Sequence, residues 1–450
     1  MVIRFYLRSS APGLTYRVMR CLLWGGTLLF SGTAWASNPM PLSMETAALF
    51  ALHKNPDVMI ALEKNKQADF AVTEARSSYY PQISATFKAG QEYNDPSAAG
   101  TLDPLGQPSQ SYDAKVIVTQ LLFDGFVTDS EVERRKQLVQ SADLQARITM
   151  EKILYDTIGA YVDVWRAQRA QSEAGRFVDV VTGIANKIKL MAAAGAESKT
   201  KKEYVDSRLA AAKSTKNSTE ADLAKALSEL ESLTGVLPPF EAQRPEQFDP
   251  TARQMDAYFS LARQENAGMQ LNQSDRAALE RQEEGQSGKY FPSLSLQLEA
   301  KQSQDVGGRV GRVRGASAMV VMNYNIFDGF AREAETGRLR SQISENDFRR
   351  DKLMRDLQKS VRQAYNQLLA TKRDLAANIK EVIASESLQM LYQQQFELGE
   401  GDVINIIEGE ERLHSAHQKG LRLEAEMVLN SYALLRQIGA LQKERFCVHC

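Results

Sequence analysis

The sequence predicts a mainly α-helical protein with a membrane β-barrel part, in which a unit of a strand hairpin and a long helix occurs twice in tandem. Three observations predict this fold. The residues Phe-Asp-Gly-Phe occur at 123–126 and again at 327–330, an offset of 204 residues. Alternating polar and apolar residues precede each copy of the motif, and a long segment without proline follows each copy. Internal repeats of this kind indicate duplicated structural units.

The repeat extends well beyond this motif. The offset of 204 residues also relates Gly195 to Gly399. An aromatic pair before a proline begins at Tyr79 in the first copy and at Tyr290 in the second, an offset of 211 residues. The additional residues of the first copy therefore lie between the aromatic pair and the Phe-Asp-Gly motif, where we expect a loop of variable length.

The N-terminus has the pattern of a secretory signal peptide. Arginines precede one short apolar segment, which ends in the small-x-small pattern of Ala34 and Ala36. We expect cleavage after Ala36, because the apolar part is too short for a membrane span. A retained anchor is the alternative. The arginine before Cys21 is unsuited to lipid attachment.

The chain divides into four expected segments. They are a signal peptide at 1–36, a first repeat at 37–240, a second repeat at 241–441 and a C-terminal tail at 442–450. The tail carries Cys447 and Cys450, which predict a local disulfide or a disordered end in an exported protein. The net charge of −1 provides no basic surface for nucleic acid.

Each repeat begins with a helix and continues into two strands. The segment 44–78 is expected to be helical, with a break near Asn55-Pro56. Side chains alternate with period two in four segments, which predicts strands near 82–93, 112–123, 293–301 and 316–326. A length of about 10–12 residues suits a tilted transmembrane strand. The flanking aromatic residues are placed where an interfacial belt would lie.

Very long helices follow the strands. Residues 127–194 and 331–398 each predict one helix of roughly 100 Å, with a narrow apolar stripe suited to coiled-coil packing. Gly195 and Gly399 are expected to end these helices, and return helices are expected at 198–234 and 402–438.

Four strands cannot close a membrane barrel, since single-chain barrels begin at eight strands. An open sheet edge in lipid leaves unpaired backbone groups at several kcal/mol each. The chain is therefore expected to share its barrel with other copies, while the helices extend the tube away from the membrane. The physical expectation is an oligomeric duct.

At this point the sequence resembles the TolC-like outer-membrane factors. The resemblance rests on the duplicated strand, Phe-Asp-Gly and long-helix plan, on His53-Lys54-Asn55-Pro56, and on Phe396-Glu397-Leu398-Gly399. It implies a homotrimer with a twelve-stranded β-barrel in the outer membrane and an α-helical tunnel across the periplasm. It further implies docking of the tunnel onto a periplasmic adaptor protein and an inner-membrane transporter.

Within that family the chain is more similar to the type I secretion branch. The similarity lies in the run 323–329, in Ala364-Tyr365-Asn366 and in the tip at 396–399. This branch implies an inner-membrane transporter of the ABC type. The first repeat departs from the pattern, because Ala194-Gly195-Ala196-Glu197 replaces the Leu-Gly form.

Candidate functional residues fall into two groups. Those expected at the barrel–tunnel junction are Phe123, Asp124, Gly125, Phe327, Asp328 and Gly329. Those expected at the periplasmic tip and its adaptor contact are Gly195, Leu398 and Gly399, with Glu400 and Asp402 as possible gate acids. In an oligomer, inward acids form rings that favour cations. The alternative is a solvated polar helix end.

The predicted function is a passive exit duct of a type I protein secretion system. The same duct could serve multidrug or metal efflux, and a different class would be an extended coiled-coil protein without a pore. No catalytic motif is present, and neither a cofactor nor a metal is expected. The pair His414 and His417 lacks further ligands for a metal.

Overall fold

The computed structural model describes residues 40–93, 109–235, 240–246, 250, 254–307 and 311–441. The expected cleavage site at Ala34 and Ala36 and the two tail cysteines lie outside these residues. From Pro39 onward the chain forms one compact unit. The two expected repeats therefore pack together as one body and are not separate globular domains.

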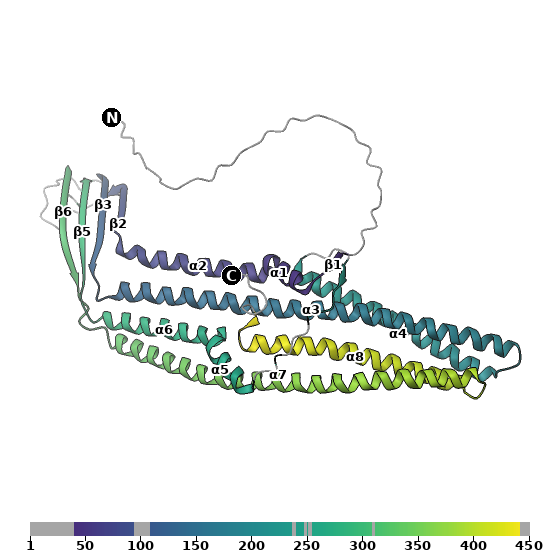
Figure 1. Ribbon diagram of the computed structural model, residues 1–450. Helices are drawn as coiled ribbons and strands as arrows, with labels where there is room; N and C mark the ends of the chain where they lie inside the picture. The colour runs from purple at the N-terminus through teal and green to yellow at the C-terminus, as the bar shows by residue number, and fades with distance from the viewer. Residues whose placement is uncertain are drawn as a thin grey trace, which may run out of the picture. The chain divides into compact units, whose positions relative to one another are not determined.

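The two halves of the chain contain the same elements in the same order (Figure 1). The first half contains α1 (Met44–Lys54), α2 (Pro56–Arg76), β2 (Gln82–Glu92), β3 (Ser109–Phe123), α3 (Val127–Ala193) and α4 (Lys199–Thr234). The second half contains α5 (Met255–Glu265), α6 (Ala267–Gly288), β5 (Ser293–Gln304), β6 (Arg312–Asn323), α7 (Ala331–Glu397) and α8 (Val403–Gln437). A short helix η1 (Ser77–Tyr79) precedes β2, and two further short strands are β1 (Met40–Leu42) and β4 (Phe240–Ala242).

The four long strands form one antiparallel sheet in the order β2-β3-β5-β6. Each half contributes a hairpin, and β3 pairs with β5 to join them (Figure 1). Val118 lies opposite Leu298 on the apolar face. On the other face, Lys115 Nζ lies 2.8 Å from Glu299 Oε2. The alternation predicted from the sequence is therefore confirmed, although β6 ends at Asn323 and not at 326 as expected.

The long helices are also confirmed. Both α3 and α7 contain 67 residues, which corresponds to roughly 100 Å of helix. The helix α3 packs along α2, α4, α6 and α8, so it contacts both halves of the chain. The helix α7 packs mainly against α5, α6 and α8 of its own half.

The apolar stripe expected on α7 is only partly buried in a single copy. Leu357, Val361 and Leu368 are buried, whereas Ile379 is 53% exposed. The physical reason is that α7 packs mainly against α6 and α8, so part of its surface faces away from the other helices of the chain. None of the helices in the described ranges combines the length and the apolar character needed to cross a lipid bilayer.

A small parallel sheet joins residues 40–42 to the linker between the two halves. Strand β1 pairs with β4, and β4 lies against α3. The Tyr161 hydroxyl on α3 lies 2.6 Å from the Leu42 carbonyl oxygen and 3.0 Å from that of Gln243, so it can donate to either. Burial raises the pKa of Tyr161 to about 12. This contact was not predicted from the sequence.

Candidate functional site

The first strand–helix junction is built around a left-handed turn. Gly125 and Phe126 have φ angles of 72° and 66°. The Asp124 carboxylate accepts a hydrogen bond of 2.8 Å from the Thr128 backbone N–H and one of 2.6 Å from its hydroxyl. These bonds satisfy free donors in the first turn of α3. The chain thus changes from strand to helix within three residues.

The second junction repeats this backbone with different side-chain contacts. Gly329 and Phe330 have φ angles of 68° and 67°. The guanidinium of Arg332 occupies the place of Thr128 and donates from Nε to Asp328 at 2.7 Å. It also donates to the Asn325 carbonyl oxygen at 2.9 Å. An ion pair therefore holds this turn, where a threonine holds the first one.

Two phenylalanines pack against each other in the same way at both junctions. The rings of Phe123 and Phe126 meet edge to face at 5.7 Å, and those of Phe327 and Phe330 do so at 5.5 Å. Edge-to-face packing is a favoured arrangement of aromatic rings. The second phenylalanine of each motif has a left-handed backbone, which is uncommon for residues other than glycine. Sequence reasoning assigned the bend to the glycine alone.

The opposite end of each long helix closes on a glycine. Gly195 and Gly399 have φ angles of 77° and 80° and lie just after α3 and α7. The next helix is capped by the side chain of Ser198 in the first half and of Asp402 in the second. Leu398 is 77% exposed at this tip. Its apolar side chain is therefore accessible at the end of the helix pair.

Lys201 links the two tips. Lys201 Nζ lies 3.3 Å from Glu197 Oε2 and 3.4 Å from Asp402 Oδ1. The Asp402 carboxylate also accepts a hydrogen bond of 3.1 Å from the Ile404 backbone N–H. Asp402 is therefore engaged in capping and pairing. Glu400 is exposed and has no ion pair within the described part of the chain. Sequence reasoning named both acids but missed Lys201.

A buried polar cluster lies on α8 above the tip. Glu410 is 5% exposed, its Oε1 accepts a hydrogen bond of 2.5 Å from Gln389, and burial raises its pKa. His414 is 8% exposed and stacks on Phe177 with the ring centres 4.6 Å apart. Burial lowers the pKa of His414. These groups join α8 to both α3 and α7.

His417, one turn further along α8, is surrounded by charge. Its Nδ1 lies 3.4 Å from Glu173 Oε2, and its Nε2 lies 3.6 Å from Glu386 Oε1. Arg176 approaches the same Nδ1 at 3.4 Å. Across the described ranges, no three His, Cys, Asp or Glu side chains are grouped so that they could hold a metal.

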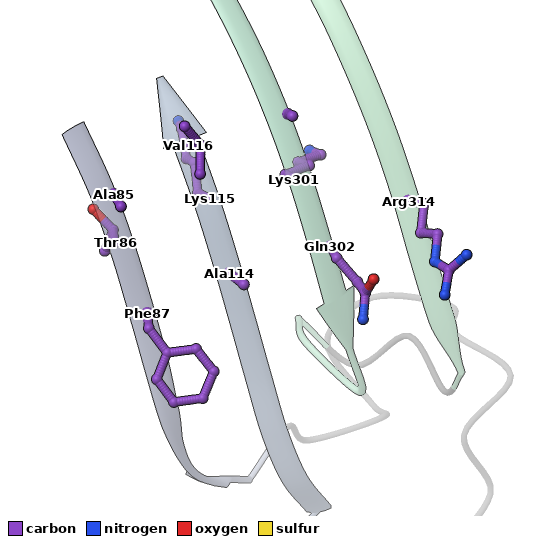
Figure 2. A pocket seen from close by; sticks show the side chains of 10 residues that line it. Ala85, Thr86, Phe87, Ala114, Lys115, Val116, Lys301, Gln302 and Arg314 are labelled. Carbon is purple, nitrogen blue, oxygen red and sulfur yellow. The ribbon is translucent and has the colours of Figure 1, made fainter. Parts of the chain in front are cut away.

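The apolar face of the sheet carries a shallow groove of about 470 Å³ (Figure 2). Small side chains line it on three strands, namely those of Ala85, Ala114 and Ala300. Gln302 and Arg314 lie toward the loop end of the strands. This groove is therefore lined by small apolar side chains in its middle and by polar side chains near the loops.

Comparison with known proteins agrees with this architecture. The family model described as outer membrane efflux protein matches residues 50–236 and 259–440. The outer membrane efflux protein BepC of Brucella suis biovar 1 is 21% identical over 429 residues, covering 94% of this chain and 91% of its own. The protein CyaE of Bordetella pertussis is 23% identical over 413 residues, covering 89% and 84%.

A solved structure has the same fold. It is that of a membrane protein from Pseudomonas aeruginosa, with a TM-score of 0.78 and 15% sequence identity. The match covers 92% of this chain and 94% of the other. At this level of identity the likeness concerns the fold.

Proposed function

We propose that this chain, which belongs to the outer membrane efflux protein family, is the exit duct of a type I secretion system and carries a polypeptide out of the cell. Members of this family are channels of the cell outer membrane that extend into the periplasm. They are non-enzymatic trimers that work with adaptor proteins and inner-membrane pumps. In this proposal the pump is an ABC transporter, which supplies the energy.

The geometry supports a duct. The sheet continues through the two junctions into helices of roughly 100 Å, so strands and helices lie end to end in one wall. The apolar face of the sheet suits contact with lipid, and charged side chains such as Lys115 and Glu299 lie on the other face. A wall of this kind conducts solutes without chemistry of its own.

One observation supports a polypeptide cargo. The second half carries the junction 323–329 and the tip Phe396-Glu397-Leu398-Gly399, which resemble the secretion branch of the family. In the structure this tip ends in an exposed leucine at a left-handed glycine turn. We assign Leu398 and Gly399 to adaptor docking, with Gly195 at the matching turn of the first half.

The second candidate is a duct for small molecules or metal ions. It is favoured by the family description and by the name of BepC, both of which refer to efflux. The same fold and the same partners would serve it. The two candidates differ in cargo and in the inner-membrane partner, which are properties outside this chain.

Comparison of the secreted proteins of a deletion strain with those of the complemented strain tests the proposal. We expect one large polypeptide to disappear from the medium and to return on complementation. Sensitivity to dyes, detergents and metal salts is measured in the same strains. An unchanged set of secreted proteins with raised sensitivity would overturn the secretion proposal in favour of efflux.

A further inference from the structure

We infer that the loop end of the sheet carries a binding site for a phosphorylated glycolipid of the outer leaflet. In this site Arg312 and Arg314 hold a phosphate, and the groove of Figure 2 holds an acyl chain. The site takes a lipid and not the transported cargo. It depends on the outer-membrane location of the family, so it exists whether the duct serves secretion or efflux.

Both arginines lie on the apolar face of the sheet. In β6 the residues with even numbers from Arg312 to Met322 lie on one face, because side chains alternate along a strand. The even residues that follow Arg314 are Ala316, Ala318, Val320 and Met322. Lys115 and Glu299 form their ion pair on the opposite face. The two arginines therefore face the lipid and not the inside of the barrel.

The arginines lie at the outer rim of the apolar band. Met322 pairs with Leu294 at the helix end of the sheet, and Arg314 pairs with Gln302 at the loop end. These two levels are eight residues apart, which corresponds to about 27 Å along a strand and about 20 Å along the membrane normal. The helices extend into the periplasm, so the loop end lies at the level of the phosphates of the outer leaflet.

Neither arginine is neutralised by a residue in the described part of the chain. Both side chains are exposed, and neither forms an ion pair with a described acid. The side chains opposite them in β5 are the neutral Gln302 and Gln304. Two residues on one face of a strand have their Cα atoms about 7 Å apart, so both guanidinium groups can reach one phosphate. The charge of this surface is therefore suited to an anion.

The groove provides room for an acyl chain. It has a volume of about 470 Å³ and lies beside Arg314 on the side toward the middle of the membrane. Its small side chains form one row across the sheet, in which the paired residues are Ala85, Val116, Ala300 and Ala316. Larger side chains border this row, with Phe87 nearer the loops and Leu298 nearer the helices. An apolar chain in the groove would contact both borders.

Figure 2 shows how the two parts of the site are arranged. Phe87 on β2 lies on one side of the groove, whereas Gln302 on β5 and Arg314 on β6 lie on the other side, toward the loops. A molecule with its phosphate at Arg314 can extend an apolar chain past Ala114 into the groove. A lipid has both of these groups, and a free phosphate ion has only one.

The first half of the chain lacks the site at the equivalent position. Arg314 corresponds to Gln110 by the offset of 204 residues, so the charge is absent there. Ala316, which pairs with Ala300 of the groove, corresponds to Tyr112. A neutral side chain replaces the arginine, and a large ring replaces a small side chain. The barrel therefore tolerates a residue without charge at this level, and the site belongs to the second hairpin alone.

Binding of lipid A to the purified full chain in detergent tests the site. Diphosphorylated lipid A and dephosphorylated lipid A are titrated separately, and the bound lipid is measured by native mass spectrometry. We expect the diphosphorylated form to bind about tenfold more tightly, because hydrogen bonds to charged groups are lost without the phosphates. An excess of inorganic phosphate should not displace it. Equal affinity for the two lipids would overturn the site, as would displacement by equimolar inorganic phosphate.

Substitution of the arginines tests the phosphate contact. Arg312→Gln combined with Arg314→Gln should weaken the binding of diphosphorylated lipid A by about tenfold. Lys301→Gln is the matched control, because Lys301 pairs with Gly315 at the neighbouring level on the opposite face. Gln110→Arg, added to the double variant, returns a positive charge where no groove is present and should not restore binding. An equal loss in Lys301→Gln, or restoration by Gln110→Arg, would contradict the site.

A larger side chain in the groove tests the acyl-chain contact. We expect Ala300→Leu to weaken binding by about fourfold, which corresponds to the loss of about one buried methylene group. Ala318→Leu is the control on the same face, at a residue that does not line the groove. Unchanged affinity in Ala300→Leu, or an equal loss in both variants, would contradict the groove as the chain site.

The comparison of the two lipids on the unsubstituted protein needs no variant, so it decides the case in which a variant fails to assemble. These measurements use lipid binding and not secretion. Loss of the proposed lipid site would therefore leave the proposed function standing, and an unchanged set of secreted proteins would leave the lipid site standing.

Discussion

Asn55 and Asn266 occupy the same position in the two halves of the molecule. Each lies at the break between two helices and donates from Nδ2 to a carbonyl near the end of the last helix of its half, at 3.1 Å to Leu233 and at 3.0 Å to Gln437. Each side-chain oxygen also caps the helix that follows. The two asparagines therefore fasten the beginning of each repeat to its end.

Loss of either asparagine should weaken the fold. We expect Asn55→Ala and Asn266→Ala each to lower the free energy of unfolding by about 1–2 kcal/mol, because a helix cap and a tertiary hydrogen bond are lost together. Chemical unfolding followed by circular dichroism measures this. Asn65→Ala is the matched control, since its bond to Asp143 is exposed. An equal loss of unfolding free energy in all three variants would contradict the stabilising role given to Asn55 and Asn266.

Close contact between two backbones at the first junction gives a second prediction. A Cβ atom added at Gly288 would lie 2.3 Å from the Gly125 carbonyl oxygen. We expect Gly288→Ala to destabilise the protein by about 2–3 kcal/mol, because the backbones must separate. Gly175→Ala is the control within α3, where an added Cβ meets nothing within 4 Å. It should stabilise the helix by about 0.5–1 kcal/mol. Similar thermal stabilities of the two variants would show that the junction is less tightly packed.

The tip acids provide a third prediction. Glu400→Gln combined with Asp402→Asn should reduce the preference of the reconstituted channel for cations, because a ring of like charges is removed. Asn caps a helix as well as Asp does, so folding should be preserved. Ion selectivity from reversal potentials in a salt gradient is the measurement. Glu397→Gln serves as a nearby control, and an unchanged selectivity in the double variant would exclude the two acids from the gate.

The buried side chains of His414 and Glu410 on α8 predict that the stability of the protein depends on pH. Burial lowers the pKa of His414, so the unfolded chain binds its proton more readily and stability falls as pH drops below about 6.5. Burial raises the pKa of Glu410, which gives the opposite trend. We expect His414→Phe to lose less stability than the wild type between pH 7 and pH 5, and Glu410→Gln to lose more.

Thermal unfolding at several pH values measures these trends. The charged groups that face the two side chains are Glu173 and Arg176 on α3 and His417 on α8. They are unchanged in both variants. His53→Gln is the control at an exposed histidine. Identical pH profiles for His414→Phe and the wild type would exclude His414 as the source of the trend.

Much of the fold could be predicted because its signals are periodic. The offset between the two Phe-Asp-Gly motifs and the proline-free segments after them predicted both helices of 67 residues to within one residue at each end. Alternation predicted the strands for the same reason. Periodic signals describe elements, whereas the pairing of β3 with β5 depends on contacts between residues far apart in sequence.

The parts that could not be predicted depend on spatial neighbours. Lys201 follows the first tip in sequence, yet its ion pair with Asp402 requires both tips to be adjacent. The left-handed backbone of Phe330 is set by the turn and not by its residue type. Ile379 fits the apolar stripe of α7 but is 53% exposed, because burial depends on the neighbours that the stripe meets and not on its spacing.

Electron microscopy of the purified protein in lipid nanodiscs shows whether copies of the chain form one duct. We predict three copies around one axis, with the four long strands of each copy in one closed barrel. The helices α3 and α7 should then extend from the barrel as one tunnel. A monomer with an open sheet, or copies whose strands do not share a barrel, would contradict a trimeric duct.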